Sequence, residues 1–250
     1  MVKLRNKKIG SGNQIYIIAE MACAHDGDLE KAKQLVDAAV KGKADAIQLQ
    51  FFSIKDISTP DHSGYEVGIR IEFSHKEWEK IYDYAFNFGI HVFACTFDLP
   101  SAELAIRLGV DGIKINSSDL SNPALLKLVA GSGIPFTLGT GASTIEEIAQ
   151  AVETCLKHGV DQIIIMHGIQ NFPTDIKDTN INKIKMLQSL FPFPVGYQDH
   201  TDASYPFSRI IDLLAIGAGA SVIEKHITID NSGNLEDTQK QLDKNFSPSI

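Results

Sequence analysis

The sequence predicts an α/β protein of the (β/α)8 TIM-barrel type, with the eighth helix absent or incomplete. Eight short apolar runs with strand character recur along the 250 residues, and stretches with helical periodicity separate them. Such alternation is typical of a parallel sheet with right-handed crossovers, which eight strands can close into a barrel. The runs lie at 15–22, 45–52, 90–97, 112–118, 135–140, 162–168, 193–199 and 221–228.

Capping signals mark where the intervening helices begin and end. Ser74 followed by Glu77, and Thr144 followed by Glu147, have the spacing of a capping box, and Phe73 can pack on Trp78 beside the first of them. A doubly wound open sheet is the alternative fold. It usually carries a glycine-rich phosphate loop after its first strand, whereas this chain has EMACAHDGD there, without GxGxxG. The barrel is therefore favoured.

Two segments interrupt the alternation. Residues 53–73 form a long connection rich in Ser, Pro, Asp and Gly, which we expect to be a loop or lid at the active site. Residues 231–250 are a polar tail, so we expect residues 1–250 to be a single barrel domain without an eighth helix. The flank of the seventh and eighth strands would then expose apolar surface, which predicts a homo-oligomer such as a dimer, or a separate capping subunit.

Composition excludes several classes of protein. The formal net charge of −8 argues against a nucleic-acid binder, which needs a basic face for phosphates. No run approaches the roughly 18 apolar residues of a membrane span, and the run after the basic N-terminus is too short for a signal peptide. Three cysteines without CxxC spacing suggest neither a disulfide framework nor a zinc knuckle. We expect a cytoplasmic protein that binds small molecules.

Polar side chains replace Val, Ile or Leu near the carboxyl end of most strands. Many recur with i, i+2 spacing, which directs both members of a pair to the same side of a strand. One such residue is most often a hydrogen-bonded strand end, but so many of them indicate a pocket at the C-terminal face of the barrel. The pairs are Gln48 and Gln50, Lys114 and Asn116, Gln198 and His200, and Glu224 and His226; Glu20, Thr96 and Thr140 end three further runs.

His200 and His226 lie near the ends of consecutive strands, which are neighbours in a barrel. Two imidazoles with oxygen ligands suit Mn²⁺, Fe²⁺, Co²⁺ or Zn²⁺ better than Ca²⁺, and open coordination positions favour a catalytic metal. Gln198 and Glu224 are then expected to orient the rings or water from behind. The alternative is a pair of core histidines held by backbone carbonyls.

Lys114 is the one lysine expected at an interior strand end, with Asn116, Ser117 and Ser118 after it. Three interpretations remain open for it. A lysine beside hydroxyls can bind a phosphate or carboxylate. It can instead form the Schiff base of an aldolase, or an ion pair with Glu20 or Glu224.

Several segments together resemble the sialic acid synthase family, whose members condense phosphoenolpyruvate with an N-acetylated amino sugar. The most specific are FPVGYQDHT and SVIEKHIT, and FACTFDLPSAE, GIKINSSDLSNPALL and LGTGASTIEEI support them. The resemblance extends from about Lys8 to Asp237 and covers the barrel domain only, without the family's antifreeze-like C-terminal domain.

The resemblance implies a role for each matching residue. It implies a divalent metal on His200 and His226, usually Mn²⁺, with Mg²⁺ and Co²⁺ as alternatives, and catalytic carboxylates at Glu20 and Asp237. For phosphoenolpyruvate it implies a site of Lys114, Ser117, Thr96, Gln48, Gln170 and Gln198. For the sugar it implies contacts from Gln50, Asp119 and Phe172.

The chain also departs from the family pattern. Gln48 replaces a lysine, Gly139 and Gln198 each replace a serine, and Phe172 replaces a tyrosine. The third strand reads CTFD in place of TPFD, so Thr96 aligns less directly, and the last carboxylate falls in LED at 235–237. An altered substrate, weaker phosphate binding and a non-catalytic homologue that binds a sugar or phosphate are the alternatives that these differences leave open.

Overall fold

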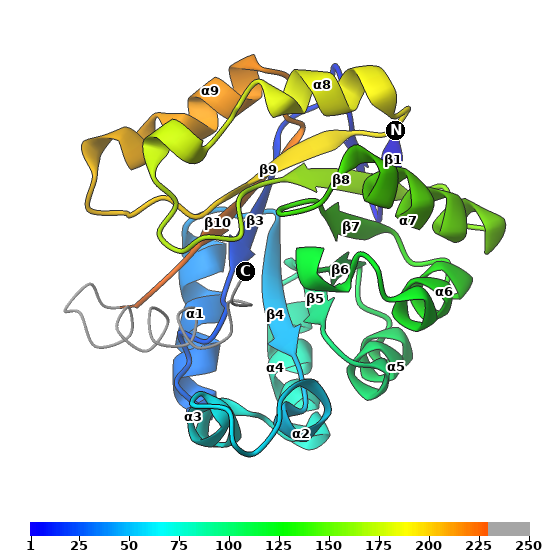
Figure 1. Ribbon diagram of the computed structural model, residues 1–250. Coiled ribbons are helices and arrows are strands. Elements are labelled where there is room, and N and C mark those ends of the chain that lie inside the picture. Colours follow the sequence, from blue (N-terminus) through cyan, green and yellow to red (C-terminus); the bar gives the residue numbers. More distant parts are fainter. Residues whose placement is uncertain (230–250) are drawn as a thin grey trace.

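The computed structural model describes residues 1–229, and its centre is a closed barrel of eight parallel strands (Figure 1). The strands follow one another around the ring in chain order, and β10 closes it by pairing with both β9 and β3. This architecture confirms the predicted (β/α)8 barrel. The barrel strands are β3 (Tyr16–Glu20), β4 (Ala46–Phe51), β5 (His91–Thr96), β6 (Gly112–Ile115), β7 (Phe136–Gly139), β8 (Ile163–His167), β9 (Val195–Asp199) and β10 (Val222–His226).

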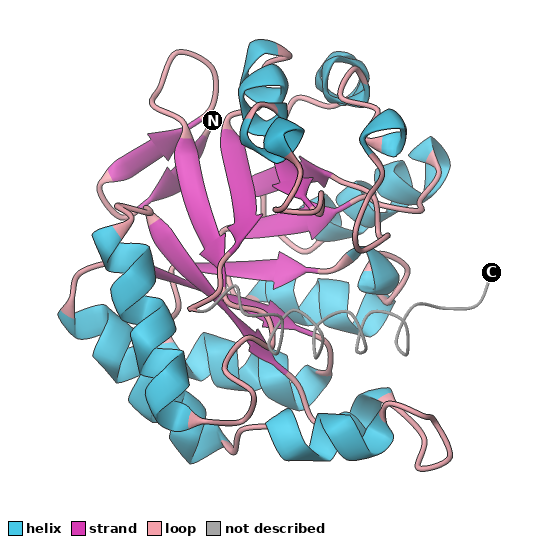
Figure 2. Ribbon diagram, turned by 90° about the vertical axis from the view of Figure 1, so that its left-hand side faces the viewer, coloured by secondary structure: helices cyan, strands magenta, loops and turns pink. Residues whose placement is uncertain are grey.

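Helices surround the barrel and connect successive strands (Figure 2). The prediction that the eighth helix is absent or incomplete, and the polar tail at 231–250, concern residues outside those that the structure describes. The helices are α1 (Leu29–Lys41), α2 (Ile54–Ile57), α3 (Tyr65–Ile71), α4 (His75–Asn87), α5 (Leu99–Leu108), α6 (Pro123–Gly131), α7 (Ile145–Lys157), α8 (Lys183–Leu190) and α9 (Ile211–Gly217), with 3-10 turns at Ser117–Asp119, Ile176–Asp178 and Pro206–Arg209.

The predicted helix caps form as their chemistry requires. The Ser74 side chain accepts from the Glu77 backbone N–H while the Glu77 carboxylate accepts from the Ser74 backbone, and Thr144 with Glu147 repeats the arrangement. These reciprocal bonds satisfy N–H groups that the first turn of a helix leaves unpaired. The rings of Phe73 and Trp78 meet edge to face with centroids 5.0 Å apart, which fixes the entry into α4.

The barrel interior is layered, apolar where the strands begin and polar where they end. Alternate residues point inward, so Ile18, Phe93 and Met166 fill the lower layer while their sequence neighbours pack against the helices. Gly196 makes room for this layer, because a Cβ there would lie 2.4 Å from Met166 Sδ. A packed lower layer leaves the carboxyl ends of the strands as the open end.

A two-stranded antiparallel sheet, which we did not predict, covers the closed end of the barrel. It consists of β1 (Val2–Leu4) and β2 (Lys7–Ile9), beside the N-terminus in Figure 2. Val2, Leu4 and Ile9 are fully buried against the first residues of the barrel strands. Three-residue strands rich in lysine have too little alternation to be recognised, so the basic N-terminus concealed this sheet.

The 53–73 connection is more ordered than expected. It contains α2 and α3, which lie side by side beyond the end of β4 (Figure 1). They pack closely because residue 68 is glycine: a Cβ there would lie 2.3 Å from Ile54 Cδ1. Only the turn between them has the loop character that the Ser, Pro and Asp residues indicate. No helix within residues 1–229 is long and apolar enough to cross a membrane.

His25, in the turn between β3 and α1, is completely buried. Its ring stacks on Phe73 with centroids 4.5 Å apart, and its Nδ1 accepts a hydrogen bond from the Gly27 N–H at 3.1 Å. Burial lowers the pKa of His25 from 6.5 to about 4. The folded protein therefore holds this imidazole neutral where an unfolded chain would protonate it.

We expect His25 to make the fold sensitive to acid. The unfolded chain binds this proton first, so the contribution of His25 is complete above pH 6.5 and is lost as the pH falls from 6.5 to 4. The loss amounts to about 3 kcal/mol in the free energy of unfolding. Denaturant titrations at pH 7 and pH 4 should show a smaller pH dependence for His25→Phe than for wild type. Exposed His158→Gln is the control, and equal pH dependence for wild type and His25→Phe would contradict this account.

Candidate active site

A cavity of about 720 Å³ opens at the carboxyl ends of the strands. Polar and apolar residues from β4, β6 and β10, from the segments that follow most of the strands, and from α2 and α3 line it. The structure brings together in this lining eight of the residues selected from the sequence: Gln50, Lys114, Ser117, Asp119, Gln170, Phe172, His200 and His226. The predicted pocket at the C-terminal face is therefore present.

Four other selected residues lie beneath this lining. Glu20, Gln48, Gln198 and Glu224 are almost completely buried on β3, β4, β9 and β10. The strand register places Glu20 beside Gln48, and Glu224 beside Gln198. Both amide atoms of Gln198 and Oε2 of Glu224 have no hydrogen-bond partner within the described protein, although buried polar groups normally have one. These residues form a polar layer under the cavity.

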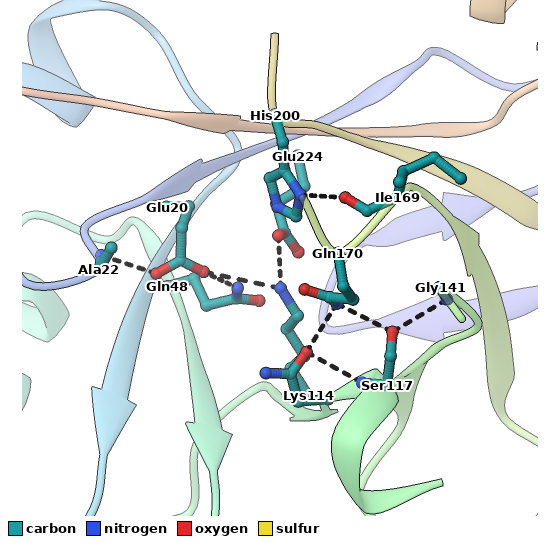
Figure 3. Close-up of polar contacts among 11 residues, drawn as sticks. Glu20, Ala22, Gln48, Lys114, Ser117, Gly141, Ile169, Gln170, His200 and Glu224 are labelled. Carbon is teal, nitrogen blue, oxygen red and sulfur yellow. Dashed lines mark hydrogen bonds and ion pairs between the residues drawn. The ribbon is translucent and has the colours of Figure 1, made fainter. Parts of the chain in front are cut away.

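Lys114 connects this layer to the cavity (Figure 3). Its Nζ donates to Glu224 Oε1 at 2.5 Å and lies 3.9 Å from Glu20 Oε2. Glu20 also accepts from the Gln48 side chain and, at 2.7 Å, from the Ala22 backbone N–H. One lysine thus compensates two buried carboxylates, which is the ion-pair interpretation that the sequence left open.

The electrostatics of this cluster set the protonation of its members. Burial raises the pKa of Glu20 to about 7, with Glu224 adding to the rise and Lys114 opposing it. Burial lowers the pKa of Lys114, but Glu224 and Glu20 outweigh that effect and raise the pKa overall. Lys114 therefore stays a cation, and Glu20 can exchange a proton near neutral pH.

Ser117 and Gln170 build one wall of the cavity. Ser117 Oγ accepts hydrogen bonds from Gln170 Nε2 at 2.9 Å and from the Gly141 N–H at 3.0 Å. Gln170 Nε2 also donates to Asn116 Oδ1 at 3.1 Å. Because Ser117 Oγ already accepts twice, its own hydrogen is free to be donated to a ligand. This wall offers a hydroxyl donor beside the Lys114 cation.

His200 and His226 face each other across the top of the cavity, with ring centroids 5.3 Å apart. His200 Nδ1 lies 2.7 Å from the Ile169 carbonyl oxygen, which can only accept a hydrogen bond. Nδ1 therefore carries the proton, and the lone pair of Nε2 is available to a metal ion. Burial lowers the pKa of both histidines, and each therefore remains neutral at pH 7. Neutral, convergent imidazoles fit a divalent metal ion.

These two histidines are the only protein ligands that the described structure suggests. Among residues 1–229 no group of three or more His, Cys, Asp or Glu side chains could hold a metal. Phe172 packs against both rings, with centroids 5.6 Å from His200 and 5.1 Å from His226. A metal bound by two imidazoles keeps several coordination positions for water and substrate.

The structure does not place every selected residue as we expected. Thr96 is not in the cavity lining. It lies on the same side of β5 as Val92 and Ala94, which pack against the helices. The buried Cys95, on the opposite side of the strand, is the residue close to the charges of Lys114 and Glu20. The supporting contact of His200 comes from the Ile169 carbonyl and not from Gln198. Glu224 bonds to Lys114 and not to a histidine ring. Asp237 lies outside the described residues.

Sequence reasoning also missed part of the cavity. Apolar side chains that occupy its α2–α3 side belong to a separate core cluster, and Asp56 adds a charge at the same side. The 53–73 segment was expected to line the site, but its individual residues had no recognisable motif, and the apolar residues after β3, β4 and β5 were not selected at all. The carbonyl of Ile169 has no sequence signal at all. The apolar lining residues are Cys23, Phe52, Ile57, Ile71 and Phe97.

Asp199 and Lys225 form an ion pair behind the histidines, on the helix-facing side of β9 and β10. Lys225 Nζ also donates to Asp212 Oδ2 at 2.9 Å and to the Ser208 carbonyl at 2.9 Å. Asp199 accepts from the Thr201 N–H at 3.0 Å. The pair therefore connects both strands to α9 and to the turn before it.

Each member of this pair precedes one of the histidines in the chain. Strand alternation turns Asp199 and Lys225 outward and the imidazoles of His200 and His226 inward. Holding the outer partners together consequently fixes the two strand ends that carry the rings. Lys225 is a positioning residue for the two histidines.

Lys225→Met should therefore have two effects. It leaves buried Asp199 without its cation, which should lower the free energy of unfolding by about 2 kcal/mol. Loss of ring positioning should weaken Mn²⁺ binding roughly tenfold. Calorimetric Mn²⁺ titration and denaturant unfolding measure the two effects.

Lys157→Met is the matched control, because the Lys157–Glu153 pair is exposed on α7. Exposed pairs contribute less than about 1 kcal/mol, so this variant should retain both stability and Mn²⁺ affinity. A Lys225→Met protein that binds Mn²⁺ like wild type would show that the outer ion pair does not position the histidines.

Comparison with known proteins agrees with this geometry. A model of the NeuB family matches residues 35–246. An uncharacterized protein of Methanocaldococcus jannaschii is 36% identical over 231 residues, which cover 92% of this chain and 67% of that protein. N,N'-diacetyllegionaminic acid synthase of Legionella pneumophila is 32% identical over 244 residues, which cover 90% of this chain and 67% of the synthase.

A solved structure has the same fold. The N-acetylneuraminic acid (sialic acid) synthetase of Leptospira borgpetersenii, in complex with citrate, superimposes with a TM-score of 0.87 and is 31% identical. The match covers 97% of this chain and 88% of that one. The chain therefore belongs to the NeuB family, and its barrel is that of a sialic acid synthase-like enzyme, as the sequence motifs predicted.

Proposed function

We propose that this protein condenses phosphoenolpyruvate with the aldehyde of an amino sugar, forming a sialic-type ulosonic acid and inorganic phosphate. The observation that carries the proposal is the convergence of Lys114 and the two histidines at one cavity, with Glu20 3.9 Å from Lys114 in the layer directly beneath it. The names of the similar proteins, a legionaminic acid synthase and a sialic acid synthetase, support the same reaction class.

Phosphoenolpyruvate fits the Lys114 side of the cavity. Its phosphate and carboxylate need a cation and hydrogen-bond donors, and Lys114 Nζ with the Ser117 hydroxyl supplies both. Gln170 holds Ser117 in place through the bond at 2.9 Å. Gln48 and Gln198 lie beneath the lining, so their part is to support Glu20 and the floor.

The histidine side of the cavity suits a divalent metal and the sugar aldehyde. His200 and His226 would hold the ion, with Mn²⁺ first and Mg²⁺ or Co²⁺ as alternatives. When bound, such an ion supplies Lewis acidity toward the carbonyl oxygen of the sugar. Gln50, Asp119 and Phe172 lie in the same lining and would contact the sugar.

The chemistry then follows from the positions of the charged residues. C3 of phosphoenolpyruvate attacks the aldehyde carbon, and positive charge develops at C2. The carboxylate of Glu20 stabilises that charge and takes a proton from the water that adds to C2. The proton that Glu20 takes from water passes to the former aldehyde oxygen. The C2 hydroxyl then loses its proton to the departing phosphate as the bond between C2 and the phosphate oxygen breaks, which leaves a C2 ketone and phosphate, whose negative charge Lys114 balances.

The geometry weighs against the alternative of a Schiff-base aldolase. A nucleophilic lysine must lose its proton, and lysines that do so have lowered pKa values. Glu224 and Glu20 raise the pKa of Lys114 instead. The remaining alternative is a non-catalytic homologue that binds a sugar or phosphate, which turnover measurements distinguish.

The proposal includes a second subunit and a cytoplasmic location. Three large apolar side chains of the α9 region, Ile210, Leu213 and Leu214, are about half exposed or more. Such a patch favours association, either of two copies or with a capping subunit. The three cysteines are buried and form no disulfide within residues 1–229, which suits a reducing compartment.

Light scattering should detect a homo-oligomer, and Leu213→Asp should shift it toward monomer, because a buried carboxylate disfavours an apolar interface. Leu156→Asp changes an equally apolar, exposed side chain on α7 and is the control. A wild-type protein that stays monomeric up to high concentration, with or without added lysate proteins, would rule out this part of the proposal.

Phosphate release tests the function itself. Wild type supplied with Mn²⁺, phosphoenolpyruvate and N-acetylated amino sugars should release inorganic phosphate, and chelator should stop it. Lys114→Met should abolish phosphoenolpyruvate binding, since it removes the cation of the site. His200→Ala and His226→Ala should each lower Mn²⁺ affinity by at least tenfold.

Calorimetry with Mn²⁺ and with phosphoenolpyruvate separates these effects from turnover. His158→Gln alters an exposed histidine and should bind Mn²⁺ like wild type. Binding of both ligands without phosphate release would favour the non-catalytic homologue. Undiminished Mn²⁺ affinity in either site variant would remove that histidine from the metal site.

A further inference from the structure

The segment that follows β8 binds His200 at two points. The His200 ring donates from Nδ1 to the Ile169 carbonyl at 2.7 Å (Figure 3), and the Thr174 backbone N–H donates to the His200 carbonyl at 2.7 Å. Thr174 is itself buried, and its hydroxyl donates to the Asn171 carbonyl at 2.5 Å, which joins the two halves of the segment. Residues 169–174 therefore hold both the ring and the backbone of His200.

Phe172, in the middle of this segment, contacts both histidines of the proposed metal site. The centroid of its ring lies 5.6 Å from that of His200 and 5.1 Å from that of His226, while the two imidazoles are 5.3 Å apart. Each ring of the three is thus in contact with the other two, in the tilted or edge-on arrangements that aromatic pairs favour. Phe172 is half-buried and lines the cavity, so it contacts the histidines from inside the site.

His226 depends on these ring contacts more than His200 does. The ring of His226 makes no hydrogen bond within residues 1–229, whereas the ring of His200 has the Ile169 carbonyl behind it. The ion pair of Lys225 fixes the backbone of β10 but does not fix the rotation of the His226 side chain about its own bonds. Phe172 and His200 are therefore the rings that limit this rotation.

We infer that Phe172 is a positioning residue for the metal site, because its ring keeps the two imidazoles in their convergent orientation. The inference rests on the proposed function, since it concerns the ion that the proposed reaction uses. A phenyl ring has no oxygen or nitrogen atom with which to bind an ion, so Phe172 acts only through the two histidines. This role is separate from contact with the sugar and exists before any sugar binds.

The test measures ion binding to the full chain. Phe172→Ala should weaken Mn²⁺ binding about tenfold in a calorimetric titration, as the loss of groups that orient metal-binding histidines typically does. Phe172→Tyr keeps the aromatic ring and should bind Mn²⁺ within about threefold of wild type. Bound Co²⁺ supplies a readout that a merely structural role would not change, because its visible absorption spectrum reports the arrangement of its ligands. The spectrum should be the same in wild type and Phe172→Tyr and should differ in Phe172→Ala.

Phe97→Ala is the matched control. Phe97 is also half-buried and also lines the cavity, but it packs on the cluster beside α2 and α3. Its truncation removes a ring of the same size and should leave the Mn²⁺ affinity and the Co²⁺ spectrum unchanged. Phosphoenolpyruvate titrated without metal checks the segment itself, because Gln170 holds Ser117 from the same segment. Phe172→Ala should keep the wild-type affinity for phosphoenolpyruvate.

Three results overturn the inference: wild-type Mn²⁺ affinity with an unchanged Co²⁺ spectrum in Phe172→Ala, Mn²⁺ binding by Phe172→Tyr as weak as that by Phe172→Ala, and an equal loss of Mn²⁺ affinity in Phe97→Ala. Equal losses of Mn²⁺ and phosphoenolpyruvate binding in Phe172→Ala, or a wild type that binds neither ion, overturn it as well.

Phosphate release by wild type, measured in parallel, separates this inference from the proposed function. Release of phosphate together with any of the overturning results leaves the proposed condensation standing. The expected differences in Mn²⁺ affinity and Co²⁺ spectrum without any release of phosphate support the inference and contradict the proposed catalysis.

Discussion

The ion cluster of Lys114, Glu20 and Glu224 is the constraint on which the rest of the site depends. A lone buried ammonium or carboxylate costs several kcal/mol, so none of the three can be buried in the barrel without the others. Glu20 and Glu224 lie on β3 and β10, which pair where the ring closes, and Lys114 reaches both carboxylates from β6 on the other side of the ring. The cluster compensates two negative charges with one positive charge; burial raises the pKa of Glu20, and the neighbouring Glu224 adds to the rise while Lys114 opposes it. Glu20 can therefore exchange a proton near neutral pH while it stays buried beside Lys114.

The layers above and below explain how the barrel tolerates such a cluster. Below it, Ile18, Phe93 and Met166 form a packed apolar floor, and the β1–β2 sheet covers the end where the strands begin. Water is thereby excluded from one side, and electrostatic interactions inside strengthen. Above it, the cavity gives a ligand access to Lys114 and the two histidines. The polar layer is thus solvated from one direction only, the direction from which substrate enters.

The sequence predicted the features that depend on local or alternating patterns. Capping boxes, the strand order and the inward direction of Lys114, Glu224 and the two histidines follow from neighbouring residues or from period-two alternation. Features decided by long-range packing were missed. The β1–β2 sheet becomes stable only against the finished barrel, and the Ile169 carbonyl reaches His200 across 31 positions of chain. Thr96 illustrates why the inward-facing residue at a strand end is hard to assign from sequence alone. A shift of one residue in the assumed register places Cys95, and not Thr96, on the inner side of the strand.

The departures from the family pattern acquire a physical meaning in this framework. Gly139, where the family usually has serine, is in contact with Ser117: a Cβ at 139 would lie 2.8 Å from Ser117 Oγ and 2.9 Å from its backbone nitrogen. Gly168 likewise leaves room for Gln198, because its Cβ would lie 2.2 Å from Gln198 Cγ. In both places a glycine at or just after the end of a strand accommodates a polar side chain from another element. The loss of a hydroxyl at 139 is therefore linked to the position of the hydroxyl at 117, and the cavity keeps a donor beside Lys114.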